Sequence, residues 1–501
     1  MAESAARAHI RLRHHPSRCF LPEVELVRHF LVLLCAATTA VQAQSTSPAA
    51  APARSTLAPG PGALSVPNAD PFPSTYRAPT SRAVLITNAT ILTAAGPQID
   101  RGFVLMRDGK IVSVGSGAAP AAGDAEVIDA NGRYVTPGLI DTHSHMGAGA
   151  APGGQALSDI NEATNPSTAR VWVEHSVWPQ DAQFPRVLAG GVTTLQILPG
   201  SANLVGGRSV VLKVVPSVSV QGMKFPGARY GLKMACGENP KRVYAARSPS
   251  TRMGNVAGYR AVWIGAEAYR RRWDKWLADK SGDPPTRDLE NETLAEVLRG
   301  NILVQNHCYR ADEMLQMIDI AKEFGYRIRS FHHGVEAYKL ADVMARDSIS
   351  GSLWSDWGGF KMEAIDGIRA NLALVHNAGA RAIVHSDDAS GAQRLNQDAS
   401  KARAAGAAVG IAIDDATLIK WVTYNPAWAL DLHDRIGSLE AGKNADVVLW
   451  SANPFSVYAR PDRVWIDGTL RLDRADPRQA WRTDFELGYV PAASTQTGGR
   501  R

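Results

Sequence analysis

The chain has 501 residues, of which 45% are hydrophobic and 20% are charged, which is the composition of a folded globular protein rather than a disordered one. That length allows one large core and a smaller second domain. The formal net charge is +6, but the basic residues are interspersed with acidic ones, so we expect no nucleic-acid partner.

The N-terminus has the pattern of an export signal. Residues 30–40 form an apolar run that is too short to span a membrane, and residues 41–43 have the small-x-small pattern of a signal-peptidase site. We therefore predict a signal peptide over residues 1–43 and an exported protein, periplasmic or secreted, without stable membrane insertion after cleavage. An uncleaved anchor is the less favoured alternative. Residues 44–82 are rich in Ala, Pro and Ser and are predicted to be a disordered linker.

Between residues 83 and 135, three runs of alternating apolar and polar residues are separated by turn signals such as Asp-Gly and Asn-Gly. This pattern predicts a small β-sheet domain. The strand predicted at residues 134–142 then leads into the sequence THSHMG. Alternate side chains of a strand share a face, so His143 and His145 can bind one metal ion as neutral imidazoles. A chance pair of polar residues is the alternative, but the apolar strand before them favours metal ligands.

Downstream of this pair, strand and helix patterns alternate. Eight strands are predicted, which is the number that closes a parallel barrel, and we expect an α/β fold with a (β/α)8 TIM-type barrel at residues 136–435. The strands after the first are expected at residues 191–198, 209–215, 230–235, 301–308, 326–333, 349–354 and 381–386. A doubly wound open sheet is the rival, but it would not explain polar residues at so many strand ends.

Several of these strand ends carry residues that can bind metal ions. They are His307, the pair His332 and His333, and the HSDD sequence at residues 385–388. A single histidine at a strand end is usually a hydrogen-bonded core or surface residue. Together with the end that carries His143 and His145, this makes four such ends in one barrel, and they favour a shared site because the carboxyl ends of all its strands converge on one face.

Two of the four cysteines, Cys236 and Cys308, lie beyond the predicted signal peptide, and each stands close to a candidate ligand. Two thiols are no disulfide framework. We expect small buried side chains at strand ends near the site, while a bridge between them stays open if the compartment is oxidising.

Together these stretches resemble the amidohydrolase superfamily, in the group similar to imidazolonepropionase. The resemblance rests on PGLIDTHSH, AGGVTTLQILPGSANLVGG, GLKMACGENPKRVY, HCYRADEM, HHGVEAYK, HSDD and NPAWALDLHDRIGSLEAGKNADVVLW. It implies a metal-dependent hydrolase on a (β/α)8 barrel with a β-sandwich built from both chain ends, at residues 83–135 and 436–475. Residues 476–501 would be a C-terminal tail.

The resemblance also implies a site with two divalent metal ions, for which zinc is expected. His143 and His145 would bind the buried ion. His307 and His333 would bind the second ion, with His333 preferred to His332 because it directly precedes a glycine.

Two further positions complete the implied site. Asp387 would bind the first ion and carry protons, with Asp388 as the fallback. A binuclear site needs a bridging group, and a carboxylated Lys233 is preferred to Glu238, which would otherwise cap a helix that begins near Pro240.

The implied reaction is hydrolysis of a C–N bond in an amide, cyclic amide or peptide-like small molecule. A metal-activated hydroxide would attack the carbonyl, and Asp387 would pass the proton to the leaving nitrogen. Tyr309, Arg310 and His385 are candidate helpers, and Arg310 could clamp a substrate carboxylate.

Two other functions stay open. A mononuclear, deaminase-like hydrolase would need only His143, His145, His307 and Asp387. A catalytically inert binding module on the same scaffold would have no need of the complete ligand set. The sequence also leaves homo-oligomer formation open.

Overall fold

The computed structural model describes residues 66–479. The predicted signal peptide, residues 44–65 of the predicted linker and nearly all of the predicted tail therefore lie outside the described residues. Residues 66–83 form no helix or strand. Within the described part of the chain, no helix combines the length and apolar character needed to cross a membrane.

The first of two sheets is the barrel-like one, and its strands follow one another in sequence order from β6 to β13. These strands are β6 (Leu139–Ser144), β7 (Val192–Ile197), β8 (Val205–Lys213), β9 (Gly231–Ala235), β10 (Leu303–Cys308), β11 (Ile328–His333), β12 (Ser350–Leu353) and β13 (Arg381–Val384). Each lies in or next to a region where the sequence predicts a strand. Pairing from β9 through β13 is parallel throughout, as is that of β6 with β7.

The expectation of eight parallel strands is wrong for β8, which is antiparallel to both β7 and β9. Only residues 198–204 separate β7 from β8, and a parallel crossover needs about a dozen residues or more. The chain must therefore turn straight back. As a result, residues 198–204 lie at the edge of the sheet where β7 and β9 end, which is also the edge that carries the candidate ligands.

Hydrogen bonds, rather than a strand ladder, join the two ends of this sheet. The backbone N–H of Ser386 donates to the Asp141 carboxylate at 3.2 Å, and the N–H of Asp387 donates to the carbonyl of His143 at 3.0 Å. Burial raises the pKa of Asp141 to about 7, although hydrogen bonds from Ser386 and His143 oppose that rise. These contacts nearly close the sheet. They bring His143, on β6, and His145, directly after β6, close to Asp387.

The second sheet is built from both parts of the chain that flank the barrel, in the order β16-β15-β14-β5-β1-β2-β3, with β4 beside β1. Its strands are β1 (Val84–Ile91), β2 (Ile99–Arg107), β3 (Lys110–Ser116), β4 (Glu126–Asp129), β5 (Tyr134–Pro137), β14 (Val447–Trp450), β15 (Pro461–Ile466) and β16 (Thr469–Asp473). Antiparallel pairing of β14 with β5 joins the two parts, as the resemblance implied. The two-layer sandwich and the domain boundaries at residues 135 and 435 stay predictions.

A single residue, Gly138, connects the two sheets between β5 and β6. The strand predicted at residues 134–142 is thus two strands that belong to different sheets. A Cβ atom at position 138 would collide with the side chain of Thr193, so only glycine fits there. Lys213 on β8 adds a buried link, because its ammonium lies 2.9 Å from Asp467 and 3.4 Å from Asp446 beside the second sheet.

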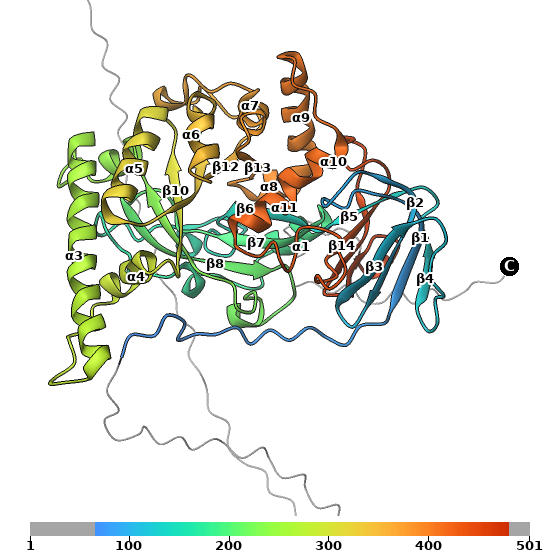
Figure 1. Cartoon of the computed structure of the whole chain (residues 1–501), viewed down its shortest axis with the longest axis horizontal. Coiled ribbons are helices and arrows are strands. Elements are labelled where there is room, and N and C mark those ends of the chain that lie inside the picture. The colour runs from blue at the N-terminus through green and yellow to red at the C-terminus, as the bar shows by residue number, and fades with distance from the viewer. Residues whose placement is uncertain (1–65, 480–501) are drawn as a thin grey trace, which may run out of the picture. The chain divides into compact units, whose positions relative to one another are not determined.

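Helices lie between the barrel strands and beyond the last of them, and Figure 1 shows α3 as the longest. They are α1 (Gln183–Ala189), α2 (Glu238–Val243), α3 (Arg252–Asp279), α4 (Leu289–Leu298), α5 (Ala311–Phe324), α6 (Ala341–Arg346), α7 (Asn371–Asn377), α8 (Ala389–Ala392), α9 (Leu395–Ala408), α10 (Asp415–Leu418) and α11 (Tyr424–Ala429). Their inner faces pack on the strands in one large apolar core, and a smaller core lies against the second sheet.

Candidate metal centre

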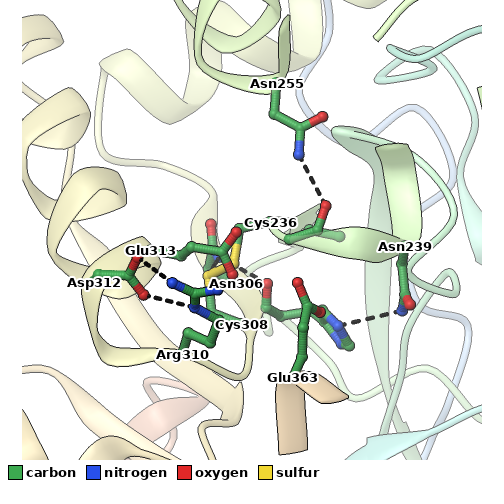
Figure 2. The surroundings of a disulfide bond; sticks show 12 residues. Cys236, Asn239, Asn255, Asn306, Cys308, Arg310, Asp312, Glu313 and Glu363 are labelled. Atoms are coloured by element: carbon green, nitrogen blue, oxygen red, sulfur yellow. Dashed lines mark hydrogen bonds and ion pairs between the residues drawn. A yellow bond between two sulfur atoms is a disulfide. The ribbon is translucent and has the colours of Figure 1, made fainter. Parts of the chain in front are cut away.

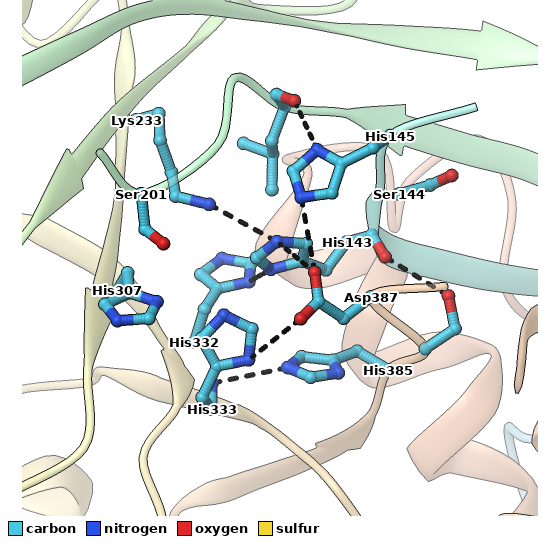
Figure 3. A network of polar contacts seen from close by, with 12 residues as sticks. His143, Ser144, His145, Ser201, Lys233, His307, His332, His333, His385 and Asp387 are labelled. Atoms are coloured by element: carbon cyan, nitrogen blue, oxygen red, sulfur yellow. Dashed lines mark hydrogen bonds and ion pairs between the residues drawn. The ribbon is translucent and has the colours of Figure 1, made fainter. Parts of the chain in front are cut away.

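Imidazoles, one lysine and one aspartate meet at the carboxyl edge of the barrel-like sheet (Figure 3). They fall into two groups, which we name by their residues. The first subsite is His143, His145 and Asp387. The second subsite is Lys233, His307 and His333.

In the first subsite, both imidazoles face the same carboxylate oxygen. The Nε2 atoms of His143 and His145 lie 3.3 Å and 3.2 Å from Oδ1 of Asp387. His143 is fully buried, whereas His145 and Asp387 keep 18% and 25% of their side chains exposed. This subsite therefore opens toward solvent on one side, which a site that admits water and substrate requires.

A backbone carbonyl fixes the tautomer of His145. Its Nδ1 lies 2.8 Å from the oxygen of Leu198, and a carbonyl oxygen can only accept, so Nδ1 must carry the hydrogen. The Nε2 atom then offers its lone pair toward Asp387. Histidines that bind metal ions are oriented in this way by a hydrogen bond to the other ring nitrogen.

A chain of hydrogen bonds, Gln305–His332–His143, fixes the tautomer of His143. The Nε2 of His332 lies 2.8 Å from the amide oxygen of Gln305, so it must donate. The Nδ1 of His332 is then free to accept from Nδ1 of His143 at 2.8 Å. That leaves Nε2 of His143 without a hydrogen and directed at Asp387. His332 thus orients a candidate ligand, while its neighbour His333 lies with its Nδ1 4.0 Å from Asp387.

The second subsite has fewer protein partners. The Nδ1 atoms of His307 and His333 are buried and have no hydrogen-bond partner among the described residues, whereas Nε2 of His307 lies 3.3 Å from Nδ2 of Asn239. Burial keeps the pKa of both imidazoles well below the usual value, so they are neutral, as metal ligands must be. A metal ion would satisfy these buried nitrogen atoms, and the residues present fit such a group.

Backbone strain accompanies two of the candidate ligands. His333 has φ of 71° and Asp387 has φ of 70°, in the left-handed region that non-glycine residues rarely occupy. Such strain persists where the surrounding structure enforces it, and it is found most often at functional sites. Here it turns the two side chains toward each other at the ends of β11 and β13.

The geometry favours Lys233 over Glu238 as the bridging residue. Nζ of Lys233 lies 3.3 Å from Nε2 of His143, and burial lowers its pKa to about 8. More of the amine is therefore neutral near neutral pH than in an exposed lysine, and only a neutral amine can be carboxylated. Glu238 instead begins α2, and its carboxylate pairs with Lys361 at 3.3 Å. Its side chain makes no cap for that helix, in contrast to the expectation.

A disulfide joins Cys236 and Cys308 (Figure 2), and Cys308 directly follows His307 of the second subsite in the sequence. The expectation of two separate thiols is therefore wrong, although both residues are buried as expected. The register of β9 and β10 pairs Ala235 with His307, so the two cysteines that follow are also neighbours. Their Cα atoms are 5.2 Å apart, within the range that a disulfide spans. Sequence spacing alone could not show that register.

The structure places the other predicted residues differently. Tyr309 lines a cavity together with Asp387, and burial and the Asp387 carboxylate raise its pKa, so its hydroxyl stays protonated. Arg310 makes two hydrogen bonds to Asp312, at 2.9 Å and 2.8 Å, and does not line that cavity. Asp388 caps α8 through the N–H groups of residues 390 and 391, so it is not a substitute for Asp387.

Gln305 and Asp141 had no assigned role in the sequence-based prediction, and His332 was considered there only as the less favoured alternative to His333. In the structure Gln305 and His332 orient His143, and Asp141 holds the loop of Ser386. Their signal in the sequence is weak, because a polar residue inside an apolar strand does not show which residue of another strand it contacts. Asn203, in the loop between β7 and β8, holds the shape of that loop, since its Nδ2 donates to two carbonyl groups and to Thr168.

Comparison with known proteins gives consistent results. Residues 134–471 match the amidohydrolase family. A solved amidohydrolase from Thermotoga maritima MSB8 is 37% identical, with a TM-score of 0.72, and the match covers 78% of this chain and 100% of that one. An amidohydrolase, tasK, from Hapsidospora irregularis is 33% identical over 408 residues, which are 75% of this chain but only 39% of that relative's length. Imidazolonepropionase from Fusobacterium nucleatum subsp. nucleatum is 25% identical over 72% of this chain and 87% of its own length.

Proposed function

The chain belongs to the amidohydrolase family, and on that premise we propose that it is a metal-dependent hydrolase of C–N bonds in small molecules. The bond would belong to an amide, a cyclic amide or a peptide-like compound. The observation that carries this proposal is the convergence of the His143 and His145 Nε2 atoms on Asp387, with a second set of buried imidazoles beside them. Neutral imidazoles with a carboxylate are a donor set that suits zinc.

Each subsite would hold one divalent ion. His143, His145 and Asp387 would bind the first, and His307 and His333 the second, with a carboxylated Lys233 between them. When bound, such ions lower the pKa of a water molecule and polarise a carbonyl group. The chain supplies the surroundings: buried imidazoles that stay neutral, and hydrogen bonds that hold two of them in the required tautomer.

Asp387 is the residue best placed to move a proton. Its Oδ1 faces the two imidazoles, and its carboxylate lines the cavity that Tyr309 also lines. We assign to it the acceptance of a proton from the attacking water and its delivery to the leaving nitrogen, a general base that becomes a general acid. The Tyr309 hydroxyl keeps its proton and is available as a donor to the substrate.

Export is part of the proposal, and it rests on the N-terminal sequence. The Cys236–Cys308 disulfide supports it, because disulfides form and persist in oxidising compartments such as the periplasm. An exported enzyme of this type would suit the breakdown of peptide-like or N-acyl amino-acid compounds outside the cytoplasm.

One observation favours a second candidate, the mononuclear deaminase-like hydrolase. The ligand atoms of His143, His145 and Asp387 all lie within 4.8 Å of one another, whereas His307 and His333 belong to no such group among the described residues. A site with one ion needs the first group and only one further histidine.

Metal content per chain, measured by elemental analysis, distinguishes these functions. We expect two ions in the wild type, fewer in Lys233→Ala, and two again in Glu238→Ala. One ion in all three proteins would establish the mononuclear alternative. A folded wild type without metal, and without activity on amides after metal addition, would overturn both.

A further inference from the structure

The segment that follows β12, residues 354–368, carries an unusual number of exposed apolar side chains. We name five of them the apolar rim: Trp357, Phe360, Met362, Ile365 and Ile368, which are between 41% and 75% exposed. Isolated exposed apolar residues are common, but several on one short segment mark a binding surface.

Two cavities connect this rim with the metal centre. The first, of about 270 Å³, is lined by His333, Trp354 and rim residues Trp357, Ile365 and Ile368. The second, of about 500 Å³, is lined by Asp387 and Tyr309 together with Trp354, Trp357 and Phe360. Each cavity therefore has a candidate ligand in one wall and the apolar rim in another.

Aromatic rings continue from the ligands out to the rim. The ring centroids of His333 and Trp354 are 4.2 Å apart, and those of Trp354 and Trp357 are 5.0 Å apart. Phe360 meets Trp354 edge to face at 5.8 Å. Trp354 and Tyr309 are buried in a small apolar cluster that is separate from the main core. Aromatic rings thus line one side of these cavities from the candidate ligands outward, and Asp356 is a charged residue that lines both cavities.

We propose that residues 354–368 bind a large apolar group, aromatic by preference, which the substrate carries next to the bond that is cleaved. This inference rests on the proposed hydrolase function and adds the chemical class of the substrate. The cavities are of the size that accepts an aromatic ring with a few further atoms. Aromatic walls favour an aromatic occupant because offset and edge-to-face contacts add to burial. The continuity with Asp387 and His333 is what assigns the surface to the substrate rather than to another molecule.

The first test compares two amides that differ in one group. N-phenylacetylglycine and N-acetylglycine share the amide and the carboxylate, and only the former carries an aromatic ring. Filling an apolar pocket by several carbon atoms is worth at least about tenfold in kcat/KM, and we expect the wild type to prefer the phenylacetyl compound by that factor or more. Trp357→Ala/Phe360→Ala should lose this preference, because kcat/KM should fall at least about tenfold more on the phenylacetyl compound than on N-acetylglycine.

Val457→Ala/Tyr458→Ala is the matched control. These two apolar residues are also exposed, at 66% and 90%, but they line neither cavity. The control should retain the wild-type preference. Equal rates on both amides in the wild type, unchanged in the rim variant, would overturn the inference and leave the hydrolase function standing.

Equilibrium binding keeps the test independent of turnover. Phenylacetate should quench or shift the tryptophan fluorescence of the metal-loaded wild type, and Trp357→Ala/Phe360→Ala should bind it at least about tenfold more weakly. If the wild type bound phenylacetate, the rim variant did not, and the wild type hydrolysed no amide, the binding surface would be supported and the hydrolase function would be overturned. Dimerisation in the ultracentrifuge that the rim variant abolishes would overturn the inference, since the rim would then join two copies of the chain.

Discussion

The two halves of the metal centre are held in different ways. The first subsite is fixed by hydrogen bonds: the Leu198 carbonyl orients His145, and Gln305 and His332 orient His143. The second subsite has buried imidazole nitrogens without partners in the described chain, but a disulfide joins the ends of the two strands that carry Lys233 and His307. The first half has the tautomers of both its imidazoles set in advance. In the second half Asn239 contacts His307 and His143 contacts Lys233, but each imidazole keeps one buried nitrogen without a partner in the described chain.

This difference predicts two ions of unequal affinity. Ligands whose orientation and tautomer are already fixed lose little freedom when the ion binds. The first subsite should therefore fill first and release its ion last. The following predictions test that order, beginning with the largest effect.

Replacing Asp387 should cause the largest loss. Asp387→Asn keeps the shape of the side chain and removes the carboxylate that both imidazoles face, so we expect kcat to fall by roughly 10²–10⁴-fold. Steady-state kinetics, with metal content measured alongside, checks this. Asp388→Asn is the matched control and should keep near wild-type kcat, because Asp388 caps α8. Similar losses in both variants would contradict the assignment.

Removing the disulfide should act on the second subsite. Cys236→Ser/Cys308→Ser opens a link between residues 72 apart, and we expect the free energy of unfolding to fall by roughly 2–4 kcal/mol. Denaturant titration measures that change. Metal titration of the same variant should show weaker binding of the second ion only. If the variant instead lost the first ion before the second, the proposed difference between the two subsites would be wrong.

In metal-stripped protein, Lys233 of the second subsite should make the free energy of unfolding depend on pH. Its folded pKa is about 8 against an ordinary value of 10.5. Between these values the unfolded chain binds more protons, so the free energy of unfolding should rise as pH increases from 8 to 10.5, by on the order of 3 kcal/mol in total. Lys233→Met should lack this rise when both proteins are unfolded by urea across that range. If the free energy of unfolding changed with pH in the same way in both proteins, Lys233 would be as fully protonated as an exposed lysine.

Gln305 should give the smallest effect, confined to the first subsite. Gln305→Leu removes the acceptor that sets the tautomer of His332 and hence of His143, and we expect about 10–100-fold weaker binding of the first ion. Isothermal titration with zinc checks this. Gln196→Leu removes another buried amide, which contacts Ser209 and no histidine, and it should leave zinc affinity unchanged.

The sequence was informative wherever the chemistry follows from local spacing. The i, i+2 spacing of His143 and His145 on a strand places them on one face, and residues that end parallel strands meet at one edge. It was less informative where a contact depends on register. The Cys236–Cys308 disulfide and the contact of His332 with His143 require knowledge of how β9, β10 and β11 are aligned. The direction of β8, by contrast, was accessible, since residues 198–204 are too few for a crossover.

The pairing of β14 with β5 also has a consequence for biosynthesis. Trp450 donates a hydrogen bond to Thr136, which lies 314 residues earlier in the chain and two residues before the glycine that leads into β6. While the chain is being synthesised, β5 therefore has one edge unpaired until residues 447–450 of β14 have left the ribosome. Contacts of such long range form late, and an unpaired strand edge invites association with other chains. β5, which leads through Gly138 into the strand that carries His143, thus gains its second neighbour only after β14 has been made.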